Sequence, residues 1–298
     1  MQAQDAFGTV LTAMVTPFTA DGSAIDFDAA AQLANDLVDL GNDGIVINGT
    51  TGESATTADE EKVELIKAVV AAVGNRARVI AGAGNNDTLH SVELAKQAAN
   101  AGAHGLLVVT PYYNKPPQAG VLAHFKAVAD ATELPVMVYD IPGRAGIAIE
   151  TPTLIELAGH PRILANKDAK ADPFAASQVM ARCDLAYYSG DDGLTLPLLA
   201  LGAVGMVSVT GHLVADRHRK VIEAVAANDL KTARAITESL IPVTEGVMTR
   251  MQGAIATKAA LDLLGRAGGG SLRLPLVPAT DEQRAQLREE LIAGGISL

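Results

Sequence analysis

Eight short apolar runs along the first 209 residues constrain the fold of this chain more than any other feature. Each is rich in aliphatic or β-branched residues and is bounded by Gly, Pro or Asp, as is typical of strands buried on both faces of a parallel sheet. The runs are TVLTAMV from Thr9, GIVIN from Gly44, ARVIAGAG from Ala77, GLLVVT from Gly105, PVMVYD from Pro135, ILANK from Ile163, LAYYSG from Leu185 and AVGMVSV from Ala203.

Helical patterns lie between these runs. Thr57, with Glu60 three residues later, has the spacing of a capping box, and Gly74 marks the end of that helix. Strands that alternate with helices imply parallel βαβ units, and eight such units predict a (β/α)8 TIM barrel. The alternative is an open doubly wound sheet, but no G-x-G-x-x-G opens a helix after the first run.

After the eighth unit the sequence stays helical, with patterns near residues 230–248, 251–264 and 281–292. No strand signal or clean linker interrupts this part. We therefore predict a barrel over residues 1–228 and a C-terminal helical extension over residues 229–298 that packs on the barrel.

Composition narrows the classes of partner. The 298 residues are 49% hydrophobic and 19% charged, enough for a large core, and the net charge of -11 argues against nucleic acid and anionic membranes as partners. Cys183 is the only cysteine and cannot form an intrachain disulfide. The opening residues show no signal-peptide pattern, and no apolar segment is long enough to span a bilayer. We expect a cytoplasmic protein.

Unusual residues gather where the strands are expected to end, which is the face on which such barrels carry their active sites. The chain has five tyrosines, and Tyr112, Tyr113 and Tyr139 follow or end the fourth and fifth runs. Lys167 ends the sixth run. One interpretation is a lysine that snorkels into water from a strand end. The other is a reactive amine held where its charge is costly.

A buried Lys167 suits imine chemistry. Desolvation lowers the pKa of a lysine from about 10.4, and the neutral amine attacks a ketone. The carbon beside the protonated imine then loses a proton, which requires a relay. Neighbouring strands lie about 4.8 Å apart, so Tyr139 can reach Lys167, and a Thr hydroxyl can complete the relay. Backbone N–H groups of the GTTGES loop suit the carboxylate of a keto acid.

Two other kinds of site are disfavoured. The GTTGES loop lacks the Gly-Lys-Ser/Thr ending of a phosphate loop, and Asp191 with Asp192 disfavours phosphate after the seventh run. The six histidines include no i, i+4 pair and have no cysteine partner, so we expect no metal site.

In combination, the motifs MVTPF, GTTGES, VTPYYNKP, YDIPGR, KDAK, YYSGDD and GMVSVT resemble the dihydrodipicolinate synthase family, within the N-acetylneuraminate lyase superfamily. The similarity runs from MVTPF to GHLVAD and is less distinct in the C-terminal helices. It implies a Schiff-base lyase that condenses pyruvate with L-aspartate 4-semialdehyde, on the route to diaminopimelate and lysine. It also implies a covalent lysine–pyruvate imine in place of a cofactor, and a homotetramer arranged as a dimer of dimers.

The resemblance also assigns roles to residues. It makes Lys167 the Schiff-base lysine. It places the proton relay on Tyr139, Thr50 and Tyr113, with Tyr113 reaching across a dimer interface into the neighbouring subunit's site. It gives the semialdehyde's carboxylate to Arg144. The remaining contacts, which bind or line pyruvate, are Thr51, Gly190 and Val207.

Two other functions stay open from the residues. A related aldolase that acts on a keto-deoxy sugar acid shares the lysine and the tyrosine but tends to lack Arg144, whose guanidinium suits a small carboxylate. A barrel that only senses a keto acid would keep Arg144 and the glycine-rich loop without needing Lys167.

Some residues depart from the family pattern. Asn166 stands where relatives usually carry an aliphatic residue; it should face the helices, because adjacent strand residues point to opposite faces. A buried amide without partners costs about 1–3 kcal/mol, so local stability is affected more than the chemistry.

The pattern of lysine-inhibited relatives is only partly present. Asp59, Lys62 and His90 differ from it, and we expect weak or absent lysine feedback. The positions that fit it are Ser54, Ala55, Asn86 and Tyr112.

Overall fold

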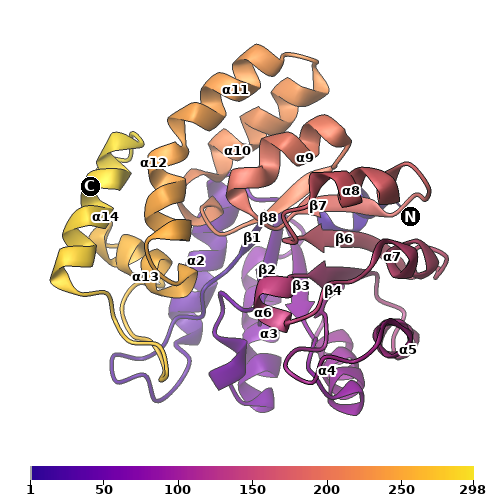
Figure 1. Ribbon diagram of the computed structural model, residues 1–298. Coiled ribbons are helices and arrows are strands. Elements are labelled where there is room, and N and C mark those ends of the chain that lie inside the picture. The colour runs from indigo at the N-terminus through magenta and orange to yellow at the C-terminus, as the bar shows by residue number, and fades with distance from the viewer. Residues whose placement is uncertain (1) are drawn as a thin grey trace.

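The computed structural model describes residues 2–298, and its eight parallel strands close into a barrel in chain order, with β8 paired to β1 (Figure 1). The predicted TIM-barrel class is confirmed, since each apolar run coincides with one strand, β6 extending one residue beyond its run. The strands are β1 Val10–Ala13, β2 Gly44–Ile47, β3 Arg78–Gly82, β4 Gly105–Val109, β5 Val136–Asp140, β6 Ile163–Asp168, β7 Ala186–Ser189 and β8 Gly205–Ser208.

Helices surround the strands and cover their outward faces (Figure 1). The helices of this layer are α2 Phe27–Asp39, α3 Asp59–Val73, α4 Thr88–Asn100, α5 Gln118–Asp130, α7 Thr151–Leu157, α8 Pro173–Met180, α9 Thr195–Leu201 and α10 Gly211–Ala226. Shorter turns of helix follow three strands, namely η1 Ser54–Thr56, α6 Pro142–Ala145 and η2 Asp192–Leu194. The helices of residues 2–298 include none with the length and hydropathy of a transmembrane span.

The N-terminal helix α1, Ala3–Phe7, closes the bottom of the barrel. Phe7 is fully buried in the inner core and meets the Tyr188 ring edge to face, with ring centroids 6.3 Å apart. The Tyr188 hydroxyl donates to the Gly8 carbonyl at 2.8 Å. The lower half of the barrel interior is therefore a packed core.

Side-chain alternation divides the barrel into two cores. Leu11, Val46, Met137 and Ala165 belong to the inner core, enclosed by the strands. A larger outer core fills the space between the strands and the helices. Because adjacent residues of a strand point to opposite faces, Lys167 lies on the same face as Ala165, toward the barrel interior, and its neighbours face the helices.

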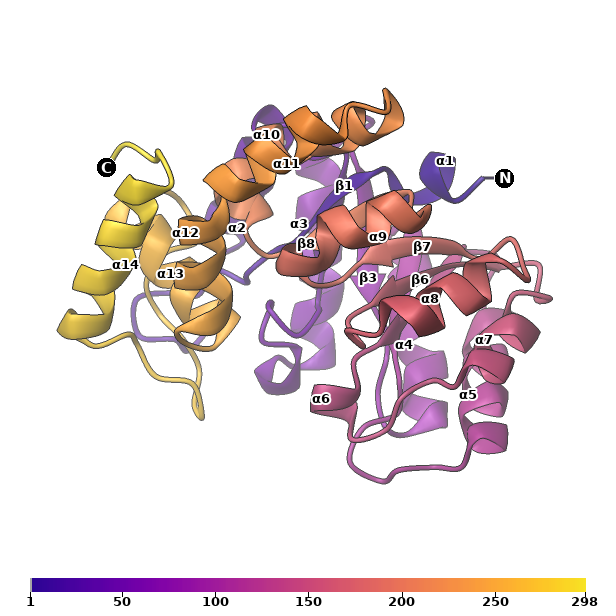
Figure 2. The same ribbon diagram turned by 45° about the horizontal axis from the view of Figure 1, so that its top comes forward.

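The C-terminal extension is helical, as expected. It contains α11 Leu230–Ser239, α12 Ile241–Thr244, the π-helical turn η3 Glu245–Thr249, α13 Gly253–Leu263 and α14 Asp281–Ala293. Figure 2 shows α12, α13 and α14 gathered at one side of the barrel, far from the N-terminus. The break after Ser239 and the π-helical turn were not expected. The division of the chain at residue 228 stays a prediction.

The predicted capping box of α3 is wrong by one residue. The helix begins at Asp59, and the Ala58 N–H donates to the Glu61 carboxylate at 2.9 Å. The Thr57 hydroxyl donates instead to the Ser54 carbonyl at 3.3 Å. Thr57 caps the end of the turn η1, which the pattern did not reveal, so the helix starts one residue later than predicted.

Asn166 is fully buried, as expected for a residue on the helix-facing side of β6. Neither its amide oxygen nor its amide nitrogen makes a hydrogen bond of normal geometry within the described residues, although the amide is close enough to the Tyr187 phenol to oppose the rise that burial causes in the pKa of that phenol. Asn42 is a useful contrast, since its side chain accepts from the Thr12 hydroxyl at 2.6 Å and donates to the Leu37 carbonyl at 2.8 Å. The two amides are equally deep, but only one is satisfied.

We predict that Asn166→Val raises the free energy of unfolding by about 1–3 kcal/mol, because it removes an unsatisfied buried amide. Urea denaturation measures the change. Asn42→Val is the matched control and should lower the free energy of unfolding, because it strands the Thr12 hydroxyl and removes one of the two hydrogen bonds that the Leu37 carbonyl accepts. A loss of stability in Asn166→Val equal to that in Asn42→Val would contradict the prediction.

Candidate active site

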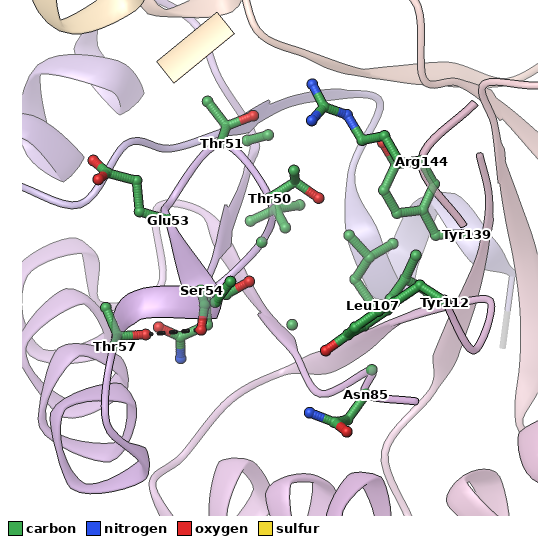
Figure 3. A pocket seen from close by; sticks show the side chains of 18 of the residues that line it. Thr50, Thr51, Glu53, Ser54, Thr57, Asn85, Leu107, Tyr112, Tyr139 and Arg144 are labelled. Atoms are coloured by element: carbon green, nitrogen blue, oxygen red, sulfur yellow. Dashed lines mark hydrogen bonds between the residues drawn. The ribbon is translucent and has the colours of Figure 1, made fainter. Parts of the chain in front are cut away.

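A cavity of about 530 Å³ opens at the C-terminal end of the barrel, where the sequence placed the chemistry. Figure 3 shows Thr50 and Thr51 on one side of it and Tyr139 and Arg144 on the other. Lys167 lines the same cavity and also a neighbouring one of about 520 Å³. Both volumes are in the range typical of small-molecule sites.

Lys167 is 4% exposed, so the snorkelling interpretation is wrong. Its Nζ lies 4.1 Å from the centroid of the Tyr139 ring. Burial lowers the pKa of the amine to about 7, with the Asp192 carboxylate opposing this shift and the Arg144 guanidinium adding to it. A large fraction of the amine is therefore neutral near pH 7.

Strand register brings the tyrosine to the lysine. Tyr139 on β5 is paired with Lys167 on β6, and Lys167 is in turn paired with Tyr188 on β7. Gly190 follows β7 and touches the lysine stem: a Cβ at this position would lie 2.9 Å from Cγ and 3.0 Å from Cε of Lys167. A side chain at this position would crowd the lysine, and Gly190 lines the second cavity beside Lys167, but its predicted place in the pyruvate pocket stays a prediction.

Tyr139 and Thr50 face the cavity without a hydrogen bond between their side chains. The Tyr139 side chain is buried, and burial raises the pKa of its phenol above the usual range, although the Arg144 guanidinium opposes the shift. The phenol therefore stays protonated at neutral pH and can donate. Among residues 2–298 neither hydroxyl is hydrogen-bonded to a protein group, so both are available to a ligand.

Thr50 and Thr51 lie on the loop between β2 and η1. Two residues of this loop, Asn48 and Glu53, have left-handed backbone conformations with φ of 56° and 55°. The Glu53 N–H donates to the Thr50 carbonyl at 3.1 Å, and the Thr16 hydroxyl donates to the Gly52 carbonyl at 2.7 Å. The loop is a tight turn over the barrel mouth that points the two threonines at the cavity.

Arg144 lies on α6 directly after β5 and lines both cavities. Its guanidinium is exposed, and no carboxylate in the described part of the chain pairs with it. A free guanidinium at the rim of a cavity is suited to bind a carboxylate through two parallel hydrogen bonds.

Tyr113 and Val207 do not line either cavity. Tyr113 is 89% exposed, with a left-handed backbone at φ 75°. Its predicted role in a neighbouring subunit stays a prediction. Val207 is packed in the inner core, so its contact with pyruvate also stays a prediction.

Asp192 was missed as a site residue, since the sequence argument used it only against phosphate. It is buried, and its carboxylate accepts from the Thr210 hydroxyl at 2.6 Å, from the Val209 N–H at 2.9 Å and from the Ser208 hydroxyl. His218 Nε2 lies 2.7 Å from the Thr210 hydroxyl oxygen. The network holds the Asp192 carboxylate near Lys167. In the sequence, the only sign of this carboxylate was the pair Asp191 and Asp192 after the seventh apolar run.

The far end of the larger cavity contains the residues of the predicted feedback pattern. Asp59 Oδ2 lies 2.8 Å from His90 Nε2, and Asp59 Oδ1 lies 3.4 Å from Lys62 Nζ. Tyr112 lines the same cavity. The expected Asn86 is not on the cavity wall, which Asn85 lines instead. Within residues 2–298 no group of three or more His, Cys, Asp or Glu residues could hold a metal ion.

Comparison with known proteins agrees with this geometry. The model of the dihydrodipicolinate synthetase family matches residues 6–293. Proteins named 4-hydroxy-tetrahydrodipicolinate synthase, from Acidothermus cellulolyticus and Kineococcus radiotolerans, are 61% and 58% identical, and each match covers 98% of this chain and 94% of the relative.

A crystal structure of the Cyanidioschyzon merolae enzyme with lysine bound superposes with a TM-score of 0.95 at 43% identity, covering 98% of this chain and 99% of that one. Fold, cavity and sequence all agree with the motifs that the strands bring together. The chain belongs to the dihydrodipicolinate synthetase family.

Proposed function

We propose that this chain condenses pyruvate with L-aspartate 4-semialdehyde to give 4-hydroxy-tetrahydrodipicolinate, on the route to diaminopimelate and lysine. The single observation that carries the mechanism is Lys167, a buried amine with a pKa of about 7 at the end of β6. Family membership supports the choice of substrates. The imine that forms on Lys167 serves in place of an external cofactor.

The chemistry begins at the neutral amine of Lys167. The amine attacks the C2 carbonyl of pyruvate, and water leaves to form a protonated imine. This electron sink allows the C3 methyl group to lose a proton, and the resulting enamine attacks the aldehyde carbon of the second substrate. The amino group of that substrate then attacks the imine carbon, which closes the ring and releases Lys167.

We assign the proton transfers to Tyr139 and Thr50. Both hydroxyls face the cavity, and the raised pKa of Tyr139 keeps its phenol a donor. Tyr113 is assigned to the same relay in a neighbouring subunit. Its 89% exposure and left-handed backbone suit a side chain that is buried by a second copy of the chain.

The two carboxylates are held at different places. The Thr51 hydroxyl and the backbone of the glycine-rich loop bind the carboxylate of pyruvate, with Gly190 and Val207 bordering the same subsite. Arg144, at the rim, binds the carboxylate of the semialdehyde. The absence of a protein partner for this guanidinium within the described residues supports that role.

We also infer a homotetramer, arranged as a dimer of dimers, that works in the cytoplasm. Phe174 on α8 and Leu201 on the neighbouring α9 are 74% and 43% exposed, and a second copy would cover them. The single free Cys183 agrees with a reducing compartment.

We predict that cyanoborohydride with pyruvate modifies Lys167, and that the rate of modification rises through about pH 7. Only the neutral amine reacts. Its fraction is about one tenth at one pH unit below the pKa and about nine tenths at one pH unit above the pKa. Peptide mapping by mass spectrometry at each pH measures the modified fraction.

Two variants sharpen this test. Lys167→Met should abolish both the label and the condensation. Lys67→Met, which removes an exposed amine paired with Glu64 on α3, should change neither. A label on another residue, or a rate that keeps rising to about pH 10 as for a free lysine, would refute the mechanism.

We predict that Arg144→Lys raises the KM for the semialdehyde by about 10- to 100-fold, because a point charge cannot replace the two parallel hydrogen bonds of a guanidinium. The KM for pyruvate should change by less than about threefold. Arg182→Ala, at an exposed position after α8, is the control and should change neither constant.

The same variants assayed with a keto-deoxy sugar acid test the related aldolase activity. Faster turnover of that acid than of the semialdehyde by the wild type would overturn the proposal.

We predict that L-lysine inhibits weakly, with less than half of the activity lost at about 1 mM. Burial raises the pKa of Asp59, but the hydrogen bond from His90 and the charge of Lys62 outweigh it and hold the pKa below its usual value. Its negative charge is thus already compensated, and a second ammonium meets Lys62 and His90. Initial rates over a lysine series measure the effect; Lys62→Ala should strengthen it, and submillimolar inhibition of the wild type would contradict it.

A further inference from the structure

The catalytic loop is attached to the C-terminal extension through Glu53. This residue lies three positions after Thr50, and Figure 3 shows its side chain on the side of the loop turned away from Tyr139. Its carboxylate is 1% exposed and accepts from Lys258 Nζ of α13 at 2.6 Å. The other carboxylate oxygen of Glu53 accepts from the backbone N–H of Arg273 at 3.0 Å.

Lys258 is as deeply buried as its partner, at 1% exposure. Its ammonium also donates to the Ser271 carbonyl at 2.6 Å and lies 4.2 Å from the centroid of the Phe18 ring. A buried charge of this kind is stable only while its partner is present, since removing one partner leaves an uncompensated charge in a low-dielectric site. The Lys258–Glu53 ion pair therefore fixes the position of the loop relative to α13.

Arg273 completes the attachment with every donor of its guanidinium. It donates to the Gly22 and Ser23 carbonyls of the loop after β1 and to the Thr56 carbonyl of η1. Two further bonds, at 2.6 and 2.7 Å, go to the Glu61 carboxylate in the first turn of α3. One side chain of the extension thus fastens the loops that follow β1 and β2.

The loop's own hydrogen bonds, from the Glu53 N–H to the Thr50 carbonyl and from the Ser54 N–H to the Gly49 carbonyl, close its turn, whereas the Glu53 carboxylate fixes that turn against α13. Glu53 has a left-handed backbone, which is costly for a residue with a Cβ and persists only where the surroundings impose it. The hydroxyls of Thr50 and Thr51 have no protein partner within residues 2–298, so their directions follow the backbone. Whatever holds Glu53 in place therefore determines where these hydroxyls point.

We propose that Lys258, assisted by Arg273, is a positioning residue for the reaction: through Glu53 it sets the Thr50–Thr51 loop in the conformation that moves protons to and from the Lys167 imine. The inference rests on the proposed function, since it assigns the extension a part in that chemistry. Lys258 itself touches neither substrate nor Lys167. Its effect is expected on proton transfer more than on imine formation.

Two measurements separate these steps. Trapping with cyanoborohydride and pyruvate reports the imine on Lys167, and NMR in D₂O reports exchange of the pyruvate methyl protons, which requires proton transfer at C3. Lys258→Met removes the charge at nearly constant side-chain length. We expect trapping within about twofold of the wild type at saturating pyruvate, and methyl exchange slower by about 10- to 100-fold, as for a displaced catalytic group.

Asp262→Asn is the matched control. Asp262 lies one turn further along α13, and its partly exposed pair with Arg284, at 2.6 Å, also belongs to the extension. Its loss should leave both trapping and exchange unchanged. Thermal melting of each variant confirms that it is folded at the assay temperature.

The outcomes are distinct. Wild-type exchange in folded Lys258→Met, or an equal fall of exchange and trapping, overturns the inference. If Lys258→Met does not fold, Glu53→Gln, which keeps the side-chain shape, takes its place: exchange at least about fivefold slower with normal trapping supports the inference, and normal exchange overturns it. Failure of the wild type to be trapped at Lys167 would refute the proposed function instead.

Discussion

The chemistry proposed for this protein depends on the cost of burying one ammonium group. Lys167 lies on the inward face of β6, and burial brings the pKa of its amine to about 7. Successive side chains of a strand point to opposite faces. Lys167 therefore points into the barrel, while Asn166 and Asp168 point toward the helices. The register with Tyr139 and the absence of a side chain at Gly190 then decide what the neutral amine can reach. The threonines and the arginine matter only if this amine is uncharged.

Fixed charges around the amine act in opposite directions. Asp192 raises the pKa of Lys167 and Arg144 lowers it, while burial is the largest influence. The Asp192 carboxylate is already held by Ser208, Val209 and Thr210 and does not form an ion pair with the amine. A direct pair would fix the lysine as an ammonium and prevent attack. In the proposed mechanism, a carboxylate held nearby but bonded elsewhere would stabilise the later iminium charge while leaving the free amine reactive, so its hydrogen-bond network would serve the site as much as the fold.

Features that depend on patterns local in the sequence could be predicted here, and contacts between residues far apart in the chain could not. The barrel and the meeting of Tyr139 with Lys167 depend on strand alternation and spacing, which an ordered series of apolar runs reveals. The start of α3 was misplaced because a turn of only three residues, η1, carries no periodic signal. The link between Glu53 and Lys258 joins residues 205 positions apart, and no local pattern connects them. Each looks like an ordinary surface charge in the sequence, and only packing of α13 on the barrel removes both from water.

This long-range link changes how the extension is understood. A barrel supplies strands that fix the lysine and the tyrosine, but the loops above those strands lack such support and must be held from outside. Here the helix α13 and the loop carrying Arg273 hold them, using charges that would be destabilising if either partner were absent. If the proposed mechanism holds, the extension and the barrel form one catalytic unit, because α13 and Arg273 supply the partners of the Glu53 carboxylate in the loop that carries Thr50. A boundary drawn between them by chain order would cut through the support of the active site.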